Sequence, residues 1–339
     1  MKKILYITCL NKKNRKYDGE RIKNTYIFDV LNKNYKTTTI NLSVHKFINS
    51  FRIIWNGLFS KKKYDYLIIS KDPHGANIIQ RMLKMVGFPS SKIIYFEIGP
   101  FLYTRIQNKT INPRTFIDDK MIVVETKSLK DELESIGFTN IDVFPNFKPL
   151  PNNKFKKINY PKKQLELVFL SRIEEQKGLF DLIDALIIVN KDYIKYRLDI
   201  FGRIQSSNDR IKLYDYLNKY KFLSYGGKMD VGSEESYETL SNYDLHVFPT
   251  RYSEGFPGSL IDFFISGVPT LSSSFQRANE ILSPDDSIVF EQFNTKDLIE
   301  KLVYIYNNQS LLNTLRSHSF DKRKEYSIQA FEEYLKRIL

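Results

Sequence analysis

Residues 254–269, EGFPGSLIDFFISGVP, form the stretch that decides the fold. An apolar run ending at Thr250 precedes it and predicts a buried strand. A turn rich in glycine and proline follows. The next residues, LIDFFISG, have the length and apolar face of a helix, which Gly267 and Pro269 end. This order of strand, glycine turn and helix is typical of doubly wound α/β sheets.

Two acidic residues, Glu254 and Asp262, stand eight positions apart on either side of this turn. A helix N-terminus presents free backbone amides and a partial positive charge, so it is suited to binding an anion. Carboxylates are suited to binding hydroxyl groups. A phosphate flanked by sugar hydroxyls is the outline of a nucleotide-sugar.

A second motif, SRIEEQKG at residues 171–178, lies upstream of the acidic pair. A predicted strand delivers Arg172 to a loop, and Lys177 precedes a glycine and an apolar helix. Arginine offers a bidentate fork and lysine a point charge, so both suit a diphosphate. Alone, this spacing would favour surface ion pairs with Glu174 and Glu175. Its position before the acidic pair favours the diphosphate.

Together the two motifs resemble glycosyltransferase family 4, whose members are retaining enzymes of the GT-B fold. The resemblance implies that Arg172 and Lys177 neutralise the leaving nucleoside diphosphate. It also implies that Glu254 binds donor-sugar hydroxyls and that Asp262 binds the ribose; the catalytic set is Arg172, Lys177 and Glu254. The family usually has Glu in place of Asp262, so this carboxylate sits about 1.5 Å, one methylene, further back.

The same resemblance extends to further ligand-binding residues. Gly202 ends a predicted strand, where bare backbone can approach a ligand, and Met229 lies in a loop that resembles the family's base-binding loop. The expected donor-binding residues are Gly19, Gly202, Met229, Gly255, Phe256, Pro257, Gly258 and Asp262. For the acceptor side we expect His74 and Glu97 near strand ends, where ligands of doubly wound sheets collect; a loop-capping role is the alternative for His74.

The length of 339 residues predicts two domains. Strands and helices alternate on both sides of a segment rich in proline and lysine, which predicts two Rossmann-like α/β domains. By the resemblance they form a GT-B fold and face a central cleft. The expected parts are an acceptor-binding domain at 1–150, an exposed linker at 151–163, a nucleotide-sugar domain at 164–320, and a C-terminal helix at 321–339 that packs back on the first domain.

The net positive charge of the chain arises entirely from its first half. Residues 1–150 hold 26 Lys and Arg against 13 Asp and Glu, whereas the remainder holds 26 of each. Nucleic acid and anionic lipid both suit such a surface, but the first half lacks nucleic-acid-binding signatures, so we favour lipid and expect no nucleic acid. The single cysteine, Cys9, fits a reducing compartment, and no apolar run is long enough for a transmembrane helix.

The segment Val44–Lys63, VHKFINSFRIIWNGLFSKKK, has two possible interpretations. Large apolar residues recur at helical spacing and three lysines follow; the apolar set is Phe47, Phe51, Ile54, Trp55, Leu58 and Phe59. A helix packed on the sheet is the more ordinary alternative. The other is a helix lying in a membrane interface with basic residues around it.

These observations favour a retaining glycosyltransferase that uses a nucleoside-diphosphate sugar, preferably a UDP-sugar. The expected acceptor is a growing, polyprenyl-linked capsule, exopolysaccharide or O-antigen glycan, at the cytoplasmic face of the membrane. No Asp-x-Asp motif is present, so we expect no metal and no cofactor. A nicotinamide oxidoreductase would need G-x-G-x-x-G after a strand, and none of the predicted strands is followed by this motif. A non-catalytic nucleotide-sugar-binding protein of the same fold remains the alternative.

Overall fold

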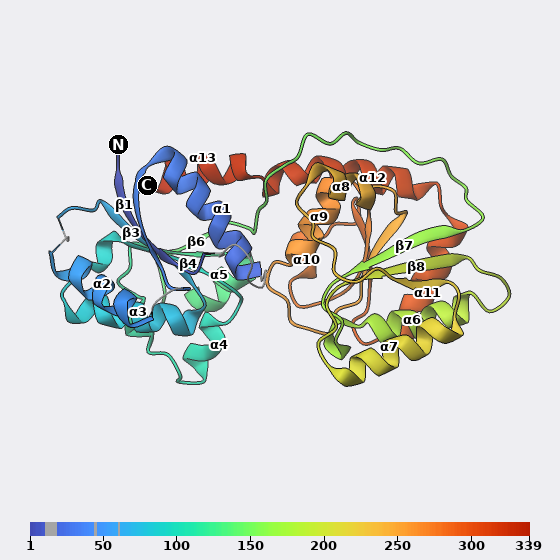
Figure 1. Cartoon of the computed structure of the whole chain (residues 1–339), viewed down its shortest axis with the longest axis horizontal. Helices are drawn as coiled ribbons and strands as arrows, with labels where there is room; N and C mark the ends of the chain where they lie inside the picture. The colour runs from blue at the N-terminus through green and yellow to red at the C-terminus, as the bar shows by residue number, and fades with distance from the viewer. Residues whose placement is uncertain (11–18, 44–45, 60–61) are drawn as a thin grey trace. The chain divides into compact units, whose positions relative to one another are not determined.

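The structure is a computed structural model that describes residues 1–10, 19–43, 46–59 and 62–339, with only the backbone of Lys46 and Phe47 (Figure 1). The chain forms two compact units, residues 1–148 with 327–339 and residues 149–326. Each unit contains a six-stranded sheet whose strands pair in parallel. The expected α/β class with two Rossmann-like domains is confirmed.

The first unit has the strand order β2-β1-β3-β4-β5-β6. Its four central strands are short apolar runs that are largely buried on both faces, as parallel sheets require. The elements are β1 (Lys3–Thr8), α1 (Gly19–Asn34), β2 (Lys36–Asn41), α2 (Lys46–Phe59), β3 (Tyr66–Lys71), α3 (Pro73–Met85), β4 (Ile93–Glu97), α4 (Leu102–Gln107), β5 (Met121–Val124), α5 (Lys127–Glu134), β6 (Ile141–Val143) and α13 (Ile328–Ile338).

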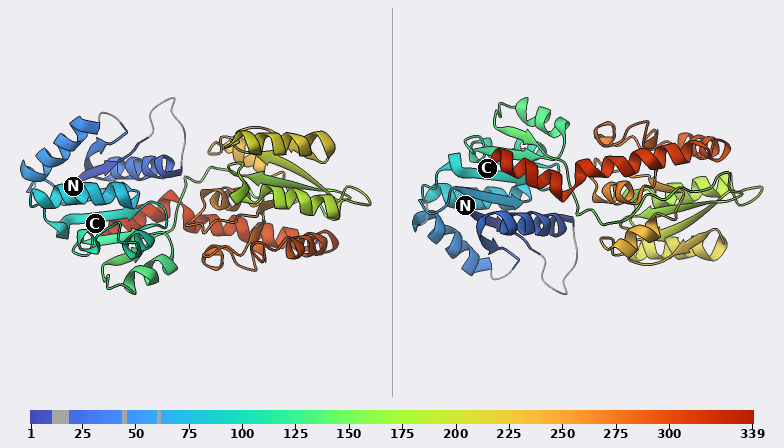
Figure 2. Two further views of the ribbon diagram at one scale, coloured as in Figure 1. Left: turned by 90° about the horizontal axis from the view of Figure 1, so that it is seen from below. Right: turned by 90° about the horizontal axis from the view of Figure 1, so that it is seen from above.

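Alternate residues of β1 serve the two faces of this sheet. Leu5 belongs to the core beneath α2, α3, α4 and α5. Tyr6 belongs to the core beneath α1 and α13, which lie on the same side of the sheet (Figure 2). In that second core, Phe331 of α13 stacks on Phe147 with ring centroids 4.0 Å apart. The C-terminal helix is thereby part of the first unit's core.

The second unit has the strand order β12-β11-β10-β7-β8-β9. Alternation in β7 sends Phe169 towards the core of α6, α7 and α11, and Val168 towards the core of α8, α9 and α10. The elements are β7 (Leu165–Leu170), α6 (Leu179–Val189), β8 (Tyr196–Phe201), α7 (Ser207–Lys219), β9 (Leu223–Tyr225), α8 (Glu234–Leu240), β10 (Leu245–Phe248), α9 (Gly258–Ser266), β11 (Thr270–Ser273), α10 (Ala278–Ile281), β12 (Ser287–Phe290), α11 (Thr295–Asn307) and α12 (Leu311–Lys322).

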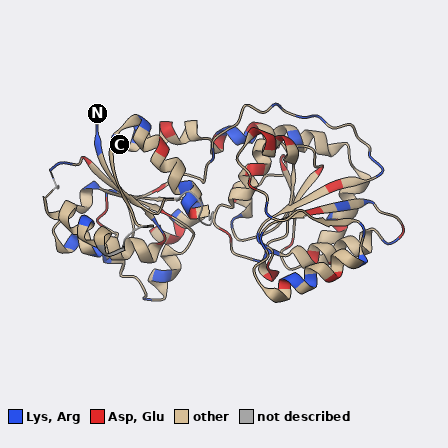
Figure 3. Ribbon diagram, viewed as in Figure 1, with Lys and Arg blue, Asp and Glu red and all other residues tan. Residues whose placement is uncertain are grey.

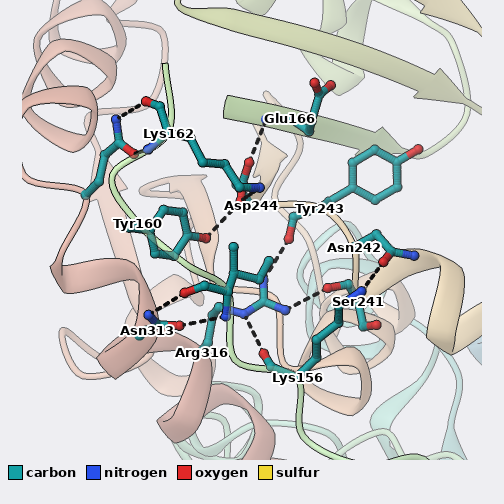
Figure 4. Close-up of polar contacts among 12 residues, drawn as sticks. Lys156, Tyr160, Lys162, Glu166, Ser241, Asn242, Tyr243, Asp244, Asn313 and Arg316 are labelled. Carbon is teal, nitrogen blue, oxygen red and sulfur yellow. Dashed lines mark hydrogen bonds and ion pairs between the residues drawn. The ribbon is translucent and has the colours of Figure 1, made fainter. Parts of the chain in front are cut away.

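Residues 149–163, which we call the strap, contain no helix or strand. Most of the expected linker at 151–163 is exposed, but particular residues of the strap are bonded to the rest of the second unit. Fully buried Arg316 of α12 donates to the carbonyls of Lys156, Ser241 and Tyr243, at 3.2, 2.7 and 2.7 Å (Figure 4). A guanidinium buried this deeply must have its donors satisfied. The strap supplies one of the acceptors, so it packs on the second unit.

A second buried charge, Asp244, holds the other end of the strap. Its carboxylate accepts hydrogen bonds from Tyr160 Oη at 2.9 Å and from Lys162 Nζ at 2.6 Å (Figure 4). Burial, followed by the negative charge of Asp244, raises the pKa of Tyr160, so the phenol stays protonated and donates. Asp244 directly precedes β10, so this network lies at the amino edge of the sheet.

Candidate functional site

The two sequence motifs meet at the carboxyl edge of the second unit's sheet. From β7 the chain continues to β8 and β9 on one side and then returns as β10 on the other side of β7. The loops after β7 and β10 are therefore neighbours at the point where the strand order reverses. In open α/β sheets this is where ligands bind.

Gly178 allows these two loops to touch. It has φ +72°, and a Cβ there would lie 1.8 Å from the carbonyl oxygen of Pro249. Any other residue would clash with the backbone after β10 and would be strained in this conformation. The glycine that follows Lys177 in the sequence thus brings that lysine against the β10 loop.

Lys177 and Glu254 form an ion pair across the contact between the loops. Lys177 Nζ lies 2.6 Å from Glu254 Oε1, and the two side chains are only 9% and 15% exposed. Thr250 Oγ1 donates to the same carboxylate oxygen at 2.7 Å. The Tyr252 ring lies beside the ammonium, with its centroid 4.9 Å from Nζ. The structure therefore unites a cation and an acid that were expected to serve one ligand.

Arg251 makes a second connection between the same loops. Its guanidinium forks onto Asp181 in the first turn of α6, with distances of 2.8 and 2.6 Å. Its backbone amide donates to Gln176 O at 2.8 Å. A bidentate fork adds geometric definition as well as energy. This connection fixes the spacing of the loops that carry Lys177 and Glu254.

Arg277, which follows β11, was missed by the sequence reasoning. It is 3% exposed, and Nη1 lies 3.4 Å from Glu254 O and 3.3 Å from Ser253 Oγ. It therefore supports the backbone of the loop that carries the acid. The available signal was its basic side chain in the loop SSSFQRANEIL, residues 272–282, just after a predicted strand.

Arg172 lies on the β7 loop but faces solvent. Its side chain is 56% exposed and Nη2 lies 3.1 Å from Glu174 Oε1. This is the surface ion pair that the motif alone would have favoured. Exposed pairs contribute little to stability, so an incoming phosphate can displace Glu174 at small cost.

Asp262 lies inside α9, away from the solvent. It is 4% exposed and its Oδ1 accepts a hydrogen bond from Tyr237 Oη of α8 at 3.0 Å. Asp262 therefore contacts α8, whereas Glu254 contacts Lys177. The two acids of the motif thus have different side-chain partners, Tyr237 for Asp262 and Lys177 for Glu254.

The turn between the two acids leads directly into the N-terminus of α9. Pro257 is the N-cap and makes no side-chain capping bond. Phe256 is buried and its ring packs on Tyr326, with centroids 5.1 Å apart. Phe256 thus anchors the turn in the core, while Gly255 and Gly258 flank the Phe256–Pro257 dipeptide.

Two residues that were expected to bind ligands, Gly202 and Glu97, make close contacts within the chain. Gly202 has φ +148°, and a Cβ there would lie 1.6 Å from Ser171 O, so the glycine accommodates the β7 loop. Glu97 is buried, and its Oε1 accepts from the amides of Phe101 and Leu102 at 3.0 and 2.7 Å. Glu97 therefore caps α4, a helix that the sequence pattern did not predict.

The remaining expected residues have simple environments. His74 is exposed in the first turn of α3, after the N-cap Asp72. Gly19 begins α1, and a Cβ there would meet no atom within 4 Å. Met229 is partly buried against the α8–α9 core.

Within the described residues, no group of three or more His, Cys, Asp or Glu side chains could hold a metal ion. In that same part of the chain, no helix is both long and apolar enough to cross a bilayer.

A family model described as glycosyl transferases group 1 matches residues 152–322, just over half of the chain. One relative is the capsular polysaccharide biosynthesis glycosyltransferase CapM of Staphylococcus aureus, 27% identical over 228 residues. Another is the poly(glycerol-phosphate) alpha-glucosyltransferase of Bacillus subtilis, 23% identical over 178 residues. The matches cover 64% and 50% of this chain, but only 57% and 25% of those relatives.

Solved structures resemble the whole chain. Anabaena HepE in complex with UDP has a TM-score of 0.74 at 11% identity and covers 99% of both chains. Sucrose-phosphate synthase from Thermosynechococcus elongatus has a TM-score of 0.73 at 11% identity, covering 100% of this chain and 98% of that one. At such identities the likeness shows the fold alone, and the expected GT-B fold is confirmed.

Proposed function

Because this chain belongs to the glycosyl transferases group 1, we propose that it is a retaining enzyme of glycosyltransferase family 4. It transfers a sugar from a nucleoside-diphosphate donor, preferably a UDP-sugar, to a growing bacterial surface glycan carried on a polyprenyl lipid. The observation that carries the proposal is the Lys177–Glu254 pair, 2.6 Å apart at the point where the strand order reverses.

The pair balances the two charges of the proposed site. Each charge is compensated by the other inside a largely buried contact. The donor carries both kinds of partner, since its diphosphate suits Lys177 and its sugar hydroxyls suit Glu254. Donor binding exchanges one ion pair for two ligand contacts. Neither charge is left buried and alone, which would be costly.

The chemical step needs positive charge at the leaving group. As the bond between the anomeric carbon and the phosphate oxygen breaks, its electron pair goes to the nucleoside diphosphate. Lys177, the guanidinium of Arg172 and the N-terminus of α9 stabilise this developing charge. The acceptor hydroxyl attacks from the same face and its proton passes to the leaving phosphate. These groups belong to the protein, so no metal is required in this proposal.

Asp262 takes the ribose in this proposal. Its Oδ1 is oriented by Tyr237 at 3.0 Å, which fixes the carboxylate on α9. A held carboxylate can accept hydrogen bonds from ribose hydroxyls with little loss of side-chain entropy. The different partners of Asp262 and Glu254 support a division of labour between nucleoside and sugar.

The printed names of the relatives support the substrate classes. Two relatives act in capsular polysaccharide biosynthesis and on poly(glycerol-phosphate), which favours a bacterial surface polymer as acceptor. HepE was solved with UDP and with UDP-glucose, which favours a UDP-sugar donor. A lipid-linked acceptor would place the enzyme at the cytoplasmic face of the membrane.

A panel of nucleotide-sugars, screened first by thermal shift and then by release of nucleoside diphosphate, tests this function. With a polyprenyl-linked acceptor, one UDP-sugar should give product and the others should give little. Donor binding without product for every acceptor tried would favour the non-catalytic sugar-nucleotide-binding alternative. No stabilisation by any nucleotide-sugar would contradict both.

A further inference from the structure

Helix α2 of the first unit exposes six large apolar side chains to solvent. Phe59, Phe51 and Trp55 are 68%, 63% and 52% exposed. The whole surface, which we call the α2 apolar face, consists of Ile48, Phe51, Ile54, Trp55, Leu58 and Phe59. In the second unit, the exposed apolar residues Ile188 and Ile211 lie on two different helices, α6 and α7. A contiguous exposed apolar face marks an interaction site.

The opposite side of α2 already packs against the first unit. Ile53 and Asn49 are buried, and Asn49 Nδ2 donates to Asn41 O at 2.8 Å. A Cβ on Gly57 would lie 2.5 Å from the Val86 side chain, so the glycine lets α2 approach the end of α3 closely. The helix is therefore fixed by a narrow inner side. The interpretation as a packed helix is confirmed for this inner side, whereas the membrane-interface interpretation of the outer side stays a prediction.

The centre of the α2 apolar face is a row of aromatic rings. Phe51 and Trp55 have ring centroids 5.9 Å apart, and Trp55 and Phe59 have centroids 4.4 Å apart. Tryptophan is favoured where one side of a ring is apolar and the other is wet. Rows of Trp, Phe and Leu on one helix are typical of segments that lie in a membrane interface.

The charged residues of α2 and α3 are of one sign. Neither α2 nor α3 contains an aspartate or glutamate (Figure 3). Arg52 on α2 is exposed, and so are Lys62 and Lys63 just after it; these three form the basic collar. Arg81 is exposed on α3. The complementary partner is therefore an apolar surface with negative charge at its boundary.

We propose that the α2 apolar face and the basic collar dock the protein on an anionic lipid bilayer. The aromatic row enters the boundary between headgroups and acyl chains, while the collar meets lipid phosphates. A second copy of the chain is a poorer occupant, because a twofold contact would bring two basic collars together. The inference extends the proposed function, since it brings the enzyme to a lipid-linked acceptor. Its test involves neither donor nor acceptor.

Intrinsic fluorescence tests the proposal directly, because Trp55 is the sole tryptophan of the sequence. Vesicles of phosphatidylglycerol and phosphatidylcholine, added to the full chain, should shift its emission to the blue. Brominated acyl chains should quench it. Vesicles of phosphatidylcholine alone should do neither, and salt should reverse the effect by screening the collar, because the Debye length falls to about 3 Å at 1 M.

Variants separate the apolar and the electrostatic contributions in vesicle co-sedimentation. The triple change Phe51→Ser, Leu58→Ser and Phe59→Ser should weaken binding at least about tenfold, because the buried apolar area is lost. Lys62→Ser with Lys63→Ser should also weaken it about tenfold. The control Ile211→Ser, which removes an exposed apolar residue of α7, should bind as the parent does. Thermal melting should be little changed in every variant.

Three outcomes would overturn the proposal. Equal, salt-insensitive binding to neutral vesicles would remove the anionic lipid from it. Binding retained by the triple variant would place the contact elsewhere. A dimer in sedimentation velocity that the triple variant abolishes, with no vesicle binding by the parent, would make this face an interface between copies. Sugar transfer could fail without any of these results, so the two proposals fail separately.

Discussion

Two clusters of buried charge lie at opposite edges of the second unit's sheet. At the amino edge, Arg316 and Asp244 are fully buried and are partnered by carbonyls, an amide, a phenol and a lysine. At the carboxyl edge, Lys177 and Glu254 are partly accessible and chiefly partner each other. The first cluster connects the strap and α12 to the sheet, and we propose no ligand there. In the second cluster, a ligand that offers a partner to each charge could replace the ion pair.

The difference teaches how to separate stability from function here. A network closed by backbone groups can only hold the fold, so its loss should appear in melting. Loss of either charge of the Lys177–Glu254 ion pair, at the edge where we propose that the donor binds, should instead lower ligand affinity and turnover.

Arg316→Ala should destabilise the protein by about 3–5 kcal/mol, because it leaves three carbonyls without their buried donor. Thermal or urea unfolding would measure the loss. Arg197, exposed on β8 and bonded to Gln164 at 2.8 Å, offers a matched control whose alanine variant should change stability by less than about 1 kcal/mol. Similar melting for both variants would show that the strap network is not structural.

Lys177→Ala and Arg172→Ala should each lower turnover about 100-fold or more, since both stabilise charge on the leaving diphosphate. Steady-state release of nucleoside diphosphate measures this. Stability should respond differently: Arg172 is exposed, so its variant should melt as the parent does. Lys177→Ala should cost less than Arg316→Ala, because Glu254 keeps the Thr250 hydroxyl as donor. Unaltered turnover in either variant would contradict its role.

Arg251→Ala should lower turnover about tenfold by loosening the loop that carries Glu254. Asp181→Asn should have a similar effect, because it removes the other half of the fork at 2.6 and 2.8 Å. The double variant should be no worse than either single one. Additive losses in this cycle would mean that the two residues do not act through one another.

The smallest expected effect is that of a chelator, which should leave activity unchanged. Arg172, Lys177 and the α9 N-terminus supply the positive charge in the proposed reaction. The assay would be run in excess EDTA, with and without added magnesium or manganese. Activity lost in EDTA and restored by either metal would contradict this part of the account.

Sequence patterns were sufficient for the strands and for the loops that carry the candidate site, although the short helix α4 was not predicted. Strand, glycine turn and helix are local, so the positions of Lys177 and Glu254 could be assigned without knowing the sheet. Arg251 and Arg277 could not be found in this way. Their partners lie in other segments, and which segments adjoin depends on the strand order.

Two further contacts have the same origin. The carbonyl oxygen of Ser171 lies where a Cβ of Gly202 would be, a contact between neighbouring strands that composition does not reveal. The strap has the prolines and lysines of an exposed linker, and the residues that hold it, Arg316 and Asp244, are distant in the sequence. For α2, apolar residues occur around most of the helix, so periodicity could not tell which side would be covered.

The central claim is that Lys177 serves the diphosphate and Glu254 the sugar. Calorimetric titration with UDP and with the UDP-sugar, on Lys177→Met and Glu254→Gln, tests it most directly. The account predicts that Lys177→Met weakens both ligands at least about tenfold, the loss of one buried charge-assisted hydrogen bond. Glu254→Gln should weaken only the UDP-sugar, and should leave UDP at least as tight because Lys177 is released from its partner. UDP affinity that falls equally in both variants, or in neither, would contradict the claim.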